Sequence, residues 1–437
     1  IVMITKSEEE HIMEEAIGGQ ISDYLIKPVN PNQILLSLKK NLNEKDLVSA
    51  KTTSDYQMEF RQIGMRLNDR LDASEWAEVY EQLVQWELKL EQSTDEGMKE
   101  IFGMQKKDAN TQFCKFVDGN YRSWLQGDED APLLSHELLE NRLFNRLDEP
   151  VFLIVIDNLR LDQWVMLKPL ISEYFNVEKE ELFYSILPTA THYARNALFA
   201  GMMPLEIEQK HPNLWLNEND EGGKNMHEEE LLRENMRSHG IQKRMSYNKV
   251  IKLDFAKRLV DRFNELMQND LNVIVYNFVD MLSHARTEME VIKELADDEA
   301  AYRSLTVSWF NHSPLKEMLK KISEAGVRTF LTTDHGTIRV DNPVRIVGDK
   351  NTNTNLRYKV GKNLNYDEKE VIVSSNPKDI MLPQENVSSQ FVFSRENDFF
   401  AYPNNYNYYV KYYNDTFQHG GVSLEEMIIP FIELSPK

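Results

Sequence analysis

Asp334 and His335 place an oxygen ligand beside a nitrogen ligand, a combination that suits a zinc-like cation. They follow the run Val327–Leu331, which is apolar or β-branched apart from Arg328 and is therefore typical of a strand. Open α/β sheets keep their ligand crevices at the carboxyl ends of the strands. A turn at Gly336 would let both side chains face one centre, so the sequence predicts metal chemistry here.

Two further strand-like runs also lead into a carboxylate. Val151–Ile156 consists of six apolar residues and ends at Asp157, and Val273–Phe278 precedes Asp280. Continuous apolar runs of this kind are typical of buried strands in a mostly parallel sheet. Because the carboxyl ends of parallel strands meet at one edge of the sheet, we expect these aspartates to lie near Asp334.

Histidines accompany the aspartates. His284 follows Asp280 by four residues, a spacing that puts both side chains on one face of a helix. His419 precedes two glycines, whose backbone adopts conformations that other residues resist, and the segment Met427–Ile432 beyond them is typical of a strand. Mixed carboxylate and imidazole ligands divide naturally into two sites. With a threonine described next, the candidate ligands are Asp157, Thr191, Asp280, His284, Asp334, His335 and His419.

Thr191 lies in the segment Pro188-Thr-Ala-Thr191, where a helix is expected to start and to continue until Gly201. A hydroxyl at this position ordinarily caps the helix. Free backbone N–H groups at a helix N-terminus also attract a phosphoryl group. A metal ion could lower the pKa of the hydroxyl and make it a nucleophile. Thr189 is an alternative for this role.

In their order along the chain, these elements resemble the alkaline phosphatase superfamily, and within it the PglZ branch, over about residues 146–437. The matching elements are Asp157…Arg160, Pro188-Thr-Ala-Thr191…Arg195…Gly201, Thr333-Asp-His-Gly336 and Phe417-Gln-His-Gly-Gly421…Glu426…Pro430. The resemblance implies two Zn²⁺ ions, with Mn²⁺ as an alternative. It assigns one ion to Asp157, Thr191, Asp334 and His335 and the other to Asp280, His284 and His419, with Thr191 bridging them as the catalytic nucleophile.

The expected reaction is two-metal hydrolysis of a phosphoester through a phosphothreonine. The resemblance favours phosphodiesters, including short or cyclic oligonucleotides, although monoesters would need the same metal ligands. Cations outnumber acids between Asp341 and Lys362, and we expect Arg345, Arg357 and Lys359 to bind the substrate. A solvated loop is the alternative explanation of this basic segment. A cysteine-derived sulfatase nucleophile is not expected, because Cys114 lies in another predicted domain.

Composition limits the class of protein. A net charge of −21 argues against broad binding of nucleic acid or anionic membranes, and no basic recognition helix for sequence-specific DNA binding is visible. No apolar run approaches the roughly 20 residues that a membrane span needs, so no membrane insertion is expected. The single cysteine, Cys114, excludes an intrachain disulfide and fits a reducing compartment. We therefore expect a cytoplasmic protein.

Residues 1–45 predict two strands and two helices in alternation. The strands are Ile1–Ile4 and Ser22–Ile26, the helices run over 7–17 and 31–42, and Thr5 and Lys27 follow the two strands. This pattern resembles the second half of a flavodoxin-like receiver domain of a two-component response regulator. The resemblance implies that Thr5, Tyr24 and Lys27 sense the phosphate. The phosphate-accepting aspartate and the acidic Mg²⁺ ligands of a complete receiver would lie upstream.

Residues 46–148 show helical periodicity over Tyr56–Leu67, Ala73–Leu90 and Met98–Leu125, and we predict a helical-bundle connector. Trp76, Trp86 and Trp124 are interpreted as core residues of this bundle. The chain is thus expected to be α/β overall, with a partial receiver at 1–45, the connector at 46–148 and an alkaline-phosphatase-like domain with a mostly parallel sheet at 149–437.

The order of these three parts resembles a family of response regulators associated with the bacterial type IX secretion system. The resemblance implies a sensor histidine kinase as a partner, type IX secretion or sigma-factor proteins as further candidates, and a homodimer formed through the phosphorylated receiver. The alternative to an enzyme is a zinc-containing regulatory scaffold that signals through protein partners.

Overall fold

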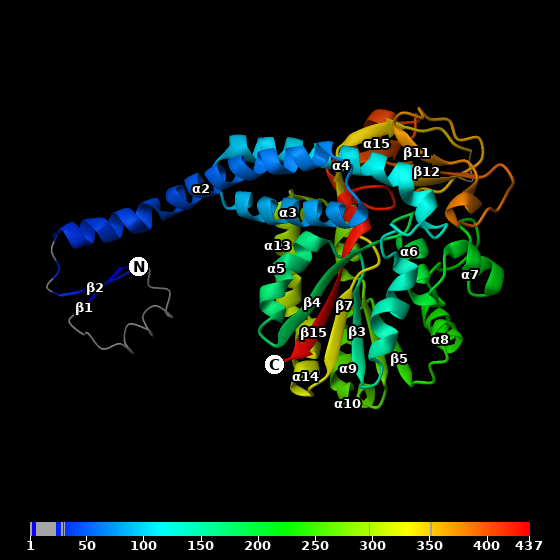
Figure 1. Cartoon of the computed structure of the whole chain (residues 1–437), viewed down its shortest axis with the longest axis horizontal. Helices are drawn as coiled ribbons and strands as arrows, with labels where there is room; N and C mark the ends of the chain where they lie inside the picture. Colours follow the sequence, from blue (N-terminus) through cyan, green and yellow to red (C-terminus); the bar gives the residue numbers. More distant parts are fainter. Residues whose placement is uncertain (1, 6–22, 28, 30, 297, 350–351) are drawn as a thin grey trace. The chain divides into compact units, whose positions relative to one another are not determined.

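The computed structural model describes residues 2–5, 23–27, 29, 31–296, 298–349 and 352–437, and Figure 1 traces them. Two compact units divide the chain. One comprises Ile1–Asp69 with Gln85–Lys106, and the other comprises Arg70–Val84 with Lys107–Lys437. Within the described ranges, none of the helices has the length and apolar character needed to cross a membrane.

In the first unit, strands β1 (Val2–Thr5) and β2 (Asp23–Ile26) pair in parallel, with Thr5 opposite Ile26. Thr5 and Lys27 therefore lie at the same end of this pair, and Lys27 is exposed. Tyr24 lies within β2. The predicted helix over 7–17 lies outside the described residues.

Helix α2 (Pro31–Asn68) is continuous over 38 residues. The prediction of one helix ending at Leu42 and another starting at Tyr56 was therefore wrong. Residues 43–55 contain neither glycine nor proline, so nothing in the intervening sequence stops the helix. The domain boundary predicted at residue 45 falls inside α2, and that boundary stays a prediction.

Aromatic packing holds α2 in the first unit. The Tyr56 ring lies 5.3 Å from the Trp86 ring and 5.8 Å from the Phe102 ring, and the Tyr56 hydroxyl donates to Gln105 Oε1 at 2.8 Å. Helices α3 (Ala73–Glu91) and α4 (Glu96–Trp124) contribute residues to both units. In the second unit Trp76 packs on Phe113. All three tryptophans are buried, which confirms their interpretation as core residues.

A six-stranded sheet organises the second unit, in the order β4-β15-β7-β3-β6-β5. The strands β3, β5, β6 and β7 are mutually parallel, and β15 runs antiparallel to both of its neighbours. Their bounds are β3 Val151–Ile156, β4 Phe175–Tyr184, β5 Met245–Val250, β6 Leu271–Tyr276, β7 Arg328–Thr332 and β15 Ile428–Pro436. The α/β class with a mostly parallel sheet is confirmed.

Helices cover both faces of this sheet, with α5 and α13 to one side in Figure 1 and α6 and α8 to the other. The helices are α5 Leu161–Ile171, α6 Thr191–Ala200, α7 Pro204–Lys210, α8 Glu228–Ser238, α9 Leu253–Asp261, α10 Phe263–Leu266, α11 Phe278–Glu288, α12 Glu290–Leu295, α13 Glu299–His312 and α14 Pro314–Glu324. Short helices η1 (Ser135–Glu137), η2 (Leu139–Leu143) and η3 (Phe144–Arg146) precede the sheet.

Between β7 and β15 the chain forms smaller elements. They are β8 Ile338–Val340, β9 Asn342–Arg345, β10 Tyr358–Gly361, β11 Val371–Ser374, η4 Pro377–Ile380, β12 Gln390–Ser394, β13 Asp398–Ala401, α15 Tyr406–Tyr413, β14 Thr416–Gln418 and α16 Leu424–Met427. Strand β14 pairs antiparallel with β8, and Gln418 lies opposite Ile338. This pairing brings the segment before His419 next to the segment after His335.

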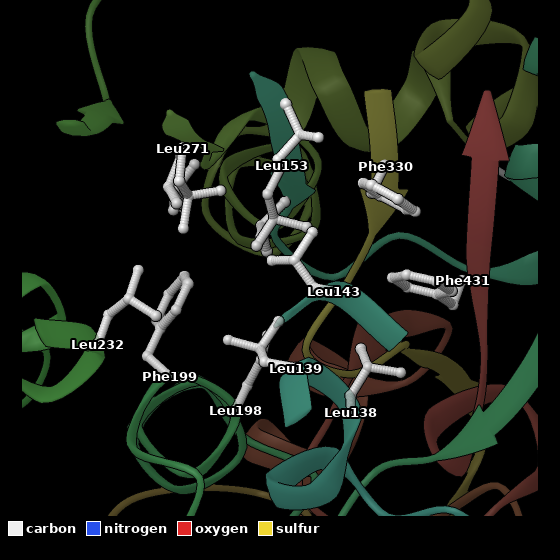
Figure 2. Close-up of a cluster of buried hydrophobic side chains, with 14 of the residues drawn as sticks. Leu138, Leu139, Leu143, Leu153, Leu198, Phe199, Leu232, Leu271, Phe330 and Phe431 are labelled. Atoms are coloured by element: carbon white, nitrogen blue, oxygen red, sulfur yellow. The ribbon is translucent and has the colours of Figure 1, made fainter. Parts of the chain in front are cut away.

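The main core lies between the sheet and the helices α6, α8 and η1–η3. Alternate residues of β3, namely Val151, Leu153 and Val155, face it, as the period-two geometry of a strand requires. Figure 2 shows Leu198 and Phe199 of α6 meeting this cluster, with Phe330 and Phe431 side by side on neighbouring strands. The rings of Phe330 and Phe431 stack with centroids 5.6 Å apart.

The register of the sheet brings three strand ends together. Ile156 of β3 lies opposite Tyr276 of β6, and Val155 lies opposite Thr332 of β7. The residues that follow these strands therefore emerge at one edge of the sheet.

Candidate metal centre

Asp157, Asp334 and His335 form the first group at this edge, with ligand atoms within 4.8 Å of one another and all three side chains 0% exposed. Asp334 Oδ1 accepts from the backbone amides of Asn158 at 3.3 Å and His335 at 3.1 Å. Asp334 Oδ2 has no hydrogen-bond partner within the described part of the chain. Arg195 Nη1 lies 3.6 Å from this oxygen, too far for a hydrogen bond. A buried carboxylate oxygen that accepts no hydrogen bond is costly, and a divalent cation would satisfy it.

The two carboxylate oxygens of Asp157 have different surroundings: one is held by hydrogen bonds from the protein, and the other faces the candidate metal ligands. Oδ2 accepts from Arg195 Nη1 at 2.6 Å and from Asn277 Nδ2 at 2.8 Å. Oδ1 lies 3.3 Å from Thr191 Oγ1 and 3.8 Å from His335 Nε2. Partners that hold one oxygen fix the direction of the other, as is usual around metal ligands.

His335 is oriented in the same way. Its Nδ1 lies 3.0 Å from Gly336 O, which can only accept, so Nδ1 carries the hydrogen and Nε2 has the free lone pair. Nε2 lies 3.0 Å from Thr191 Oγ1. Burial lowers the pKa of His335 to about 4, which favours the neutral imidazole that binds metals.

Gly336 is required for a different reason than predicted. Its backbone is not in the left-handed region, but a Cβ at this position would lie 1.9 Å from Glu425 O. The constraint is therefore a close approach of two backbones beside the first group, and not a turn that only glycine can make.

Asp280, His284 and His419 form the second group, again with ligand atoms within 4.8 Å of one another. Asp280 Oδ1 lies 3.5 Å from Nε2 of both histidines and has no hydrogen-bond partner among the described residues. Although burial opposes the charged imidazolium, the adjacent carboxylate of Asp280 raises the pKa of His419. A divalent cation would replace that proton, so this donor set also fits a metal ion.

The two groups adjoin each other. The His335 and His419 rings stack with centroids 4.3 Å apart and an interplanar angle of 23°. Thr191 Oγ1 contacts both Asp157 and His335 of the first group. The structure thus brings all seven predicted candidate ligands to one place, from α6, α11 and the segments after β3, β7 and β14.

Thr189 and Thr191 have different surroundings. Thr189 is 0% exposed, and its Oγ1 donates to Gly421 O at 2.8 Å and accepts from Gly420 N at 3.1 Å. Its carbonyl oxygen lies 3.3 Å from His419 Nδ1. Gly420 has φ +121°, a conformation that side chains other than glycine disfavour. Thr189 therefore holds the loop of His419, whereas the hydroxyl of Thr191 faces the ligands.

Sequence reasoning assigned no role to Arg195, Glu228 or Asn277. Arg195 lies one helical turn after Thr191, and this spacing could have indicated that both face the centre. Its side chain is 1% exposed and bonds Asp157 on one side and Glu228 on the other. Although burial disfavours charge, these carboxylates raise the pKa of Arg195, which stays a cation beside the first group.

The predicted substrate-binding cations do not gather at this centre. Arg357 is 0% exposed and pairs with Glu426, with Nη2 2.6 Å from Oε2. Lys359 is also 0% exposed, and its Nζ donates to Asn353 O at 2.9 Å. Neither side chain is exposed to a substrate in this structure, which argues against the predicted role of both.

Arg345 is exposed, and it lines an open cavity of about 770 Å³ together with residues 365–370 and Val347. None of the candidate metal ligands lines this cavity. The basic segment of the sequence thus combines buried structural cations with a surface arginine.

Comparison with known families gives two matches. The model of the BREX system PglZ alkaline phosphatase-like domain matches residues 139–434, and the model of the PorX response regulator linker domain matches residues 46–125. Together they confirm the predicted resemblance to response regulators that carry a PglZ domain. Among curated proteins, none matches the chain.

Solved structures with some similarity include human ectonucleotide pyrophosphatase/phosphodiesterase 5, at 11% identity over 65% of this chain and 87% of that chain, with a TM-score of 0.40. Phosphonoacetate hydrolase from Sinorhizobium meliloti, in complex with phosphonoformate, has 13% identity over 65% of this chain and 89% of that chain, with a TM-score of 0.41. Similarity at this level says nothing about a shared activity.

Proposed function

Because the chain belongs to the family of the BREX system PglZ alkaline phosphatase-like domain, we propose that it is a metal-dependent phosphoester hydrolase and the effector part of a response regulator. One observation carries the proposal. Two groups of carboxylates and imidazoles adjoin each other beside a threonine hydroxyl. Asp334 in the first group and Asp280 in the second each keep one buried oxygen that accepts no hydrogen bond from the described residues.

The donor set fits two Zn²⁺ ions, with Mn²⁺ as the alternative. The first ion would be held by Asp157, Thr191, Asp334 and His335, and the second by Asp280, His284 and His419. When bound, such ions would polarise the phosphoryl oxygens and lower the pKa of a coordinated hydroxyl.

The residues of the chain supply the remaining chemistry. Thr191 Oγ1 forms a bond to phosphorus as the bond from phosphorus to the leaving alcohol breaks, and the hydroxyl proton of Thr191 leaves with the alcohol, which gives a phosphothreonine. The oxygen of a water molecule then bonds to phosphorus as the bond between Oγ1 and phosphorus breaks, and a proton of that water restores the hydroxyl. Thr191 is the first residue of α6, so the positive end of this helix would face the attacked phosphoryl group. Arg195 holds Asp157 in place during both steps.

We infer phosphodiesters as the substrate class, with short or cyclic oligonucleotides as candidates. The ligand residues do not distinguish diesters from monoesters, so this choice rests on the PglZ family. The match to a response regulator linker supports a sensor histidine kinase as a partner. A role in type IX secretion, contacts with sigma-factor proteins, a cytoplasmic location and a homodimer through a phosphorylated receiver remain parts of this proposal.

Turnover of bis-p-nitrophenyl phosphate tests the proposed function. Zinc-loaded wild type should release p-nitrophenol, chelation should abolish the release, and added zinc should restore it. Thr191→Ala should lose turnover while metal analysis still finds bound zinc, whereas Thr111→Ala on α4 should behave as wild type. Equal turnover in Thr191→Ala would remove Thr191 from the mechanism. Metal-loaded wild type that hydrolyses no phosphoester would favour the regulatory scaffold.

A further inference from the structure

The carboxyl end of β5 lies beside the nucleophile, although it supplies none of the seven candidate ligands. Lys249 Nζ donates to Asn225 O at 3.1 Å, and Asn225 Nδ2 donates to the backbone oxygen of Thr191 at 2.9 Å. Two successive hydrogen bonds thus connect β5 to the residue proposed to attack phosphorus.

A second connection reaches the same strand end from the metal ligands. Asn277 donates from its side chain to Asp157 Oδ2 at 2.8 Å and from its backbone to Val250 O at 3.3 Å. Ile251, which follows Val250, is therefore close to the start of α11. Met281 lies one turn after Asn277 and three residues before His284, so it shares their face of α11.

Large apolar side chains are exposed at this strand end. Met226 is 70% exposed, Ile251 54%, Leu253 56% and Met281 46%. Met226 follows Asn225, which binds Lys249. We call Met226, Lys249, Ile251, Leu253 and Met281 the β5-end surface. Exposed apolar side chains close to a site that would bind a ligand are available to an apolar part of that ligand.

Lys249 adds a cation to this apolar surface. Its side chain is 24% exposed, and its ammonium uses two of its three donors, on Asn225 O and on Glu228 Oε2. A ligand that covers this surface therefore meets apolar contacts and one positive charge close to the attacked phosphate. A nucleoside flanked by a second phosphate has both properties.

We propose that the β5-end surface binds the nucleoside and the flanking phosphate next to the scissile bond of an oligonucleotide. The apolar side chains contact the base, with methionine sulfur against its ring, and Lys249 binds the flanking phosphate. This inference rests on the proposed phosphodiesterase function. A phospholipid suits the surface less well, because it has one phosphate in its diester and long acyl chains that need deep burial, and the net charge of −21 opposes anionic bilayers.

Binding to zinc-loaded full-length protein tests the proposal, with a 5′-phosphorylated dinucleotide whose linkage is a phosphorothioate that resists hydrolysis. Ile251→Ser should raise the Kd about fivefold, because part of the contact with the base is lost. Lys249→Met should also lower the slope of log Kd against log salt by about 0.7, the loss expected for one phosphate contact on a single strand. Val387→Ser, at a side chain 96% exposed elsewhere, is the matched control and should leave the Kd unchanged.

Turnover of bis-p-nitrophenyl phosphate is measured on the same samples. The ratio of dinucleotide affinity to small-diester turnover should fall in Ile251→Ser. An unchanged Kd in Ile251→Ser together with an unchanged salt slope in Lys249→Met overturns the proposal. Wild type that hydrolyses the small diester but prefers phosphatidylcholine vesicles to the dinucleotide also overturns it, and leaves the proposed function intact. Wild type that neither binds nor hydrolyses any of these compounds overturns both.

Discussion

The two threonines of the segment 189–191 allow a sharp test, because valine replaces each of them with almost the same shape. In Thr189→Val, the Gly420 amide and the Gly421 carbonyl lose their shared partner in a site that is 0% exposed. Each buried polar group left without a partner costs about 1–3 kcal/mol, so the loss of both bonds should lower the free energy of unfolding by about 2–6 kcal/mol. Thr191 is only partly buried, and Thr191→Val should cost less than about 1 kcal/mol.

Urea unfolding in the presence of a chelator measures these costs without a contribution from bound metal. Turnover of bis-p-nitrophenyl phosphate at saturating zinc measures the effect of each substitution on activity. Thr191→Val should lose turnover to the background rate. Thr189→Val should keep turnover but need more zinc to reach it, because the loop that carries His419 is held less firmly.

The reverse pattern would refute this reasoning. If Thr189→Val lost turnover while its stability and zinc requirement stayed at wild-type values, Thr189 would be the better candidate for the nucleophile. A Thr189→Val protein as stable as wild type would also show that its two hydrogen bonds to the glycine loop contribute little.

Two further predictions concern the buried cations. Burial lowers the pKa of Lys359 to about 7. Between that value and the ordinary pKa of lysine, the unfolded chain binds a proton that the folded chain lacks. The free energy of unfolding therefore rises with pH over this range. The difference in the free energy of unfolding between Lys359→Met and wild type should therefore depend on pH. It should favour the variant by about 2–3 kcal/mol more at about pH 6.5 than at about pH 9. Equal differences at the two values in thermal or urea unfolding would contradict this. Arg357→Met leaves the 0% exposed Glu426 without its cation and should cost about 3–5 kcal/mol in urea unfolding. Arg345→Met should change stability by less than about 0.5 kcal/mol. A raised KM for the diester in Arg357→Met, with stability unchanged, would instead support a role in substrate binding.

Local sequence patterns predicted the sheet well. Val151–Ile156 is β3 in the structure, residue for residue, because a short apolar run rich in valine and isoleucine favours a strand buried on both faces. The ends of neighbouring elements were less certain. Phe278 was expected in a strand but begins α11, where its ring stacks on Trp309 with centroids 4.4 Å apart. A tertiary contact of this kind leaves no local signal in the sequence.

By itself, the sequence determined which residues could act at the centre. Carboxylates and histidines at strand ends and one helical turn apart are local features, and the parallel order of the strands carries them to one edge of the sheet. Only the tertiary structure decided which polar residues are free to act. Arg357, Lys359 and Thr189 look available in the sequence, but all three are buried. Arg357 and Thr189 bond residues far along the chain, and the Lys359 ammonium lies over the Tyr402 ring. Burial and pairing depend on what other segments bring to a residue, and these long-range partners cannot be inferred from neighbours in the sequence.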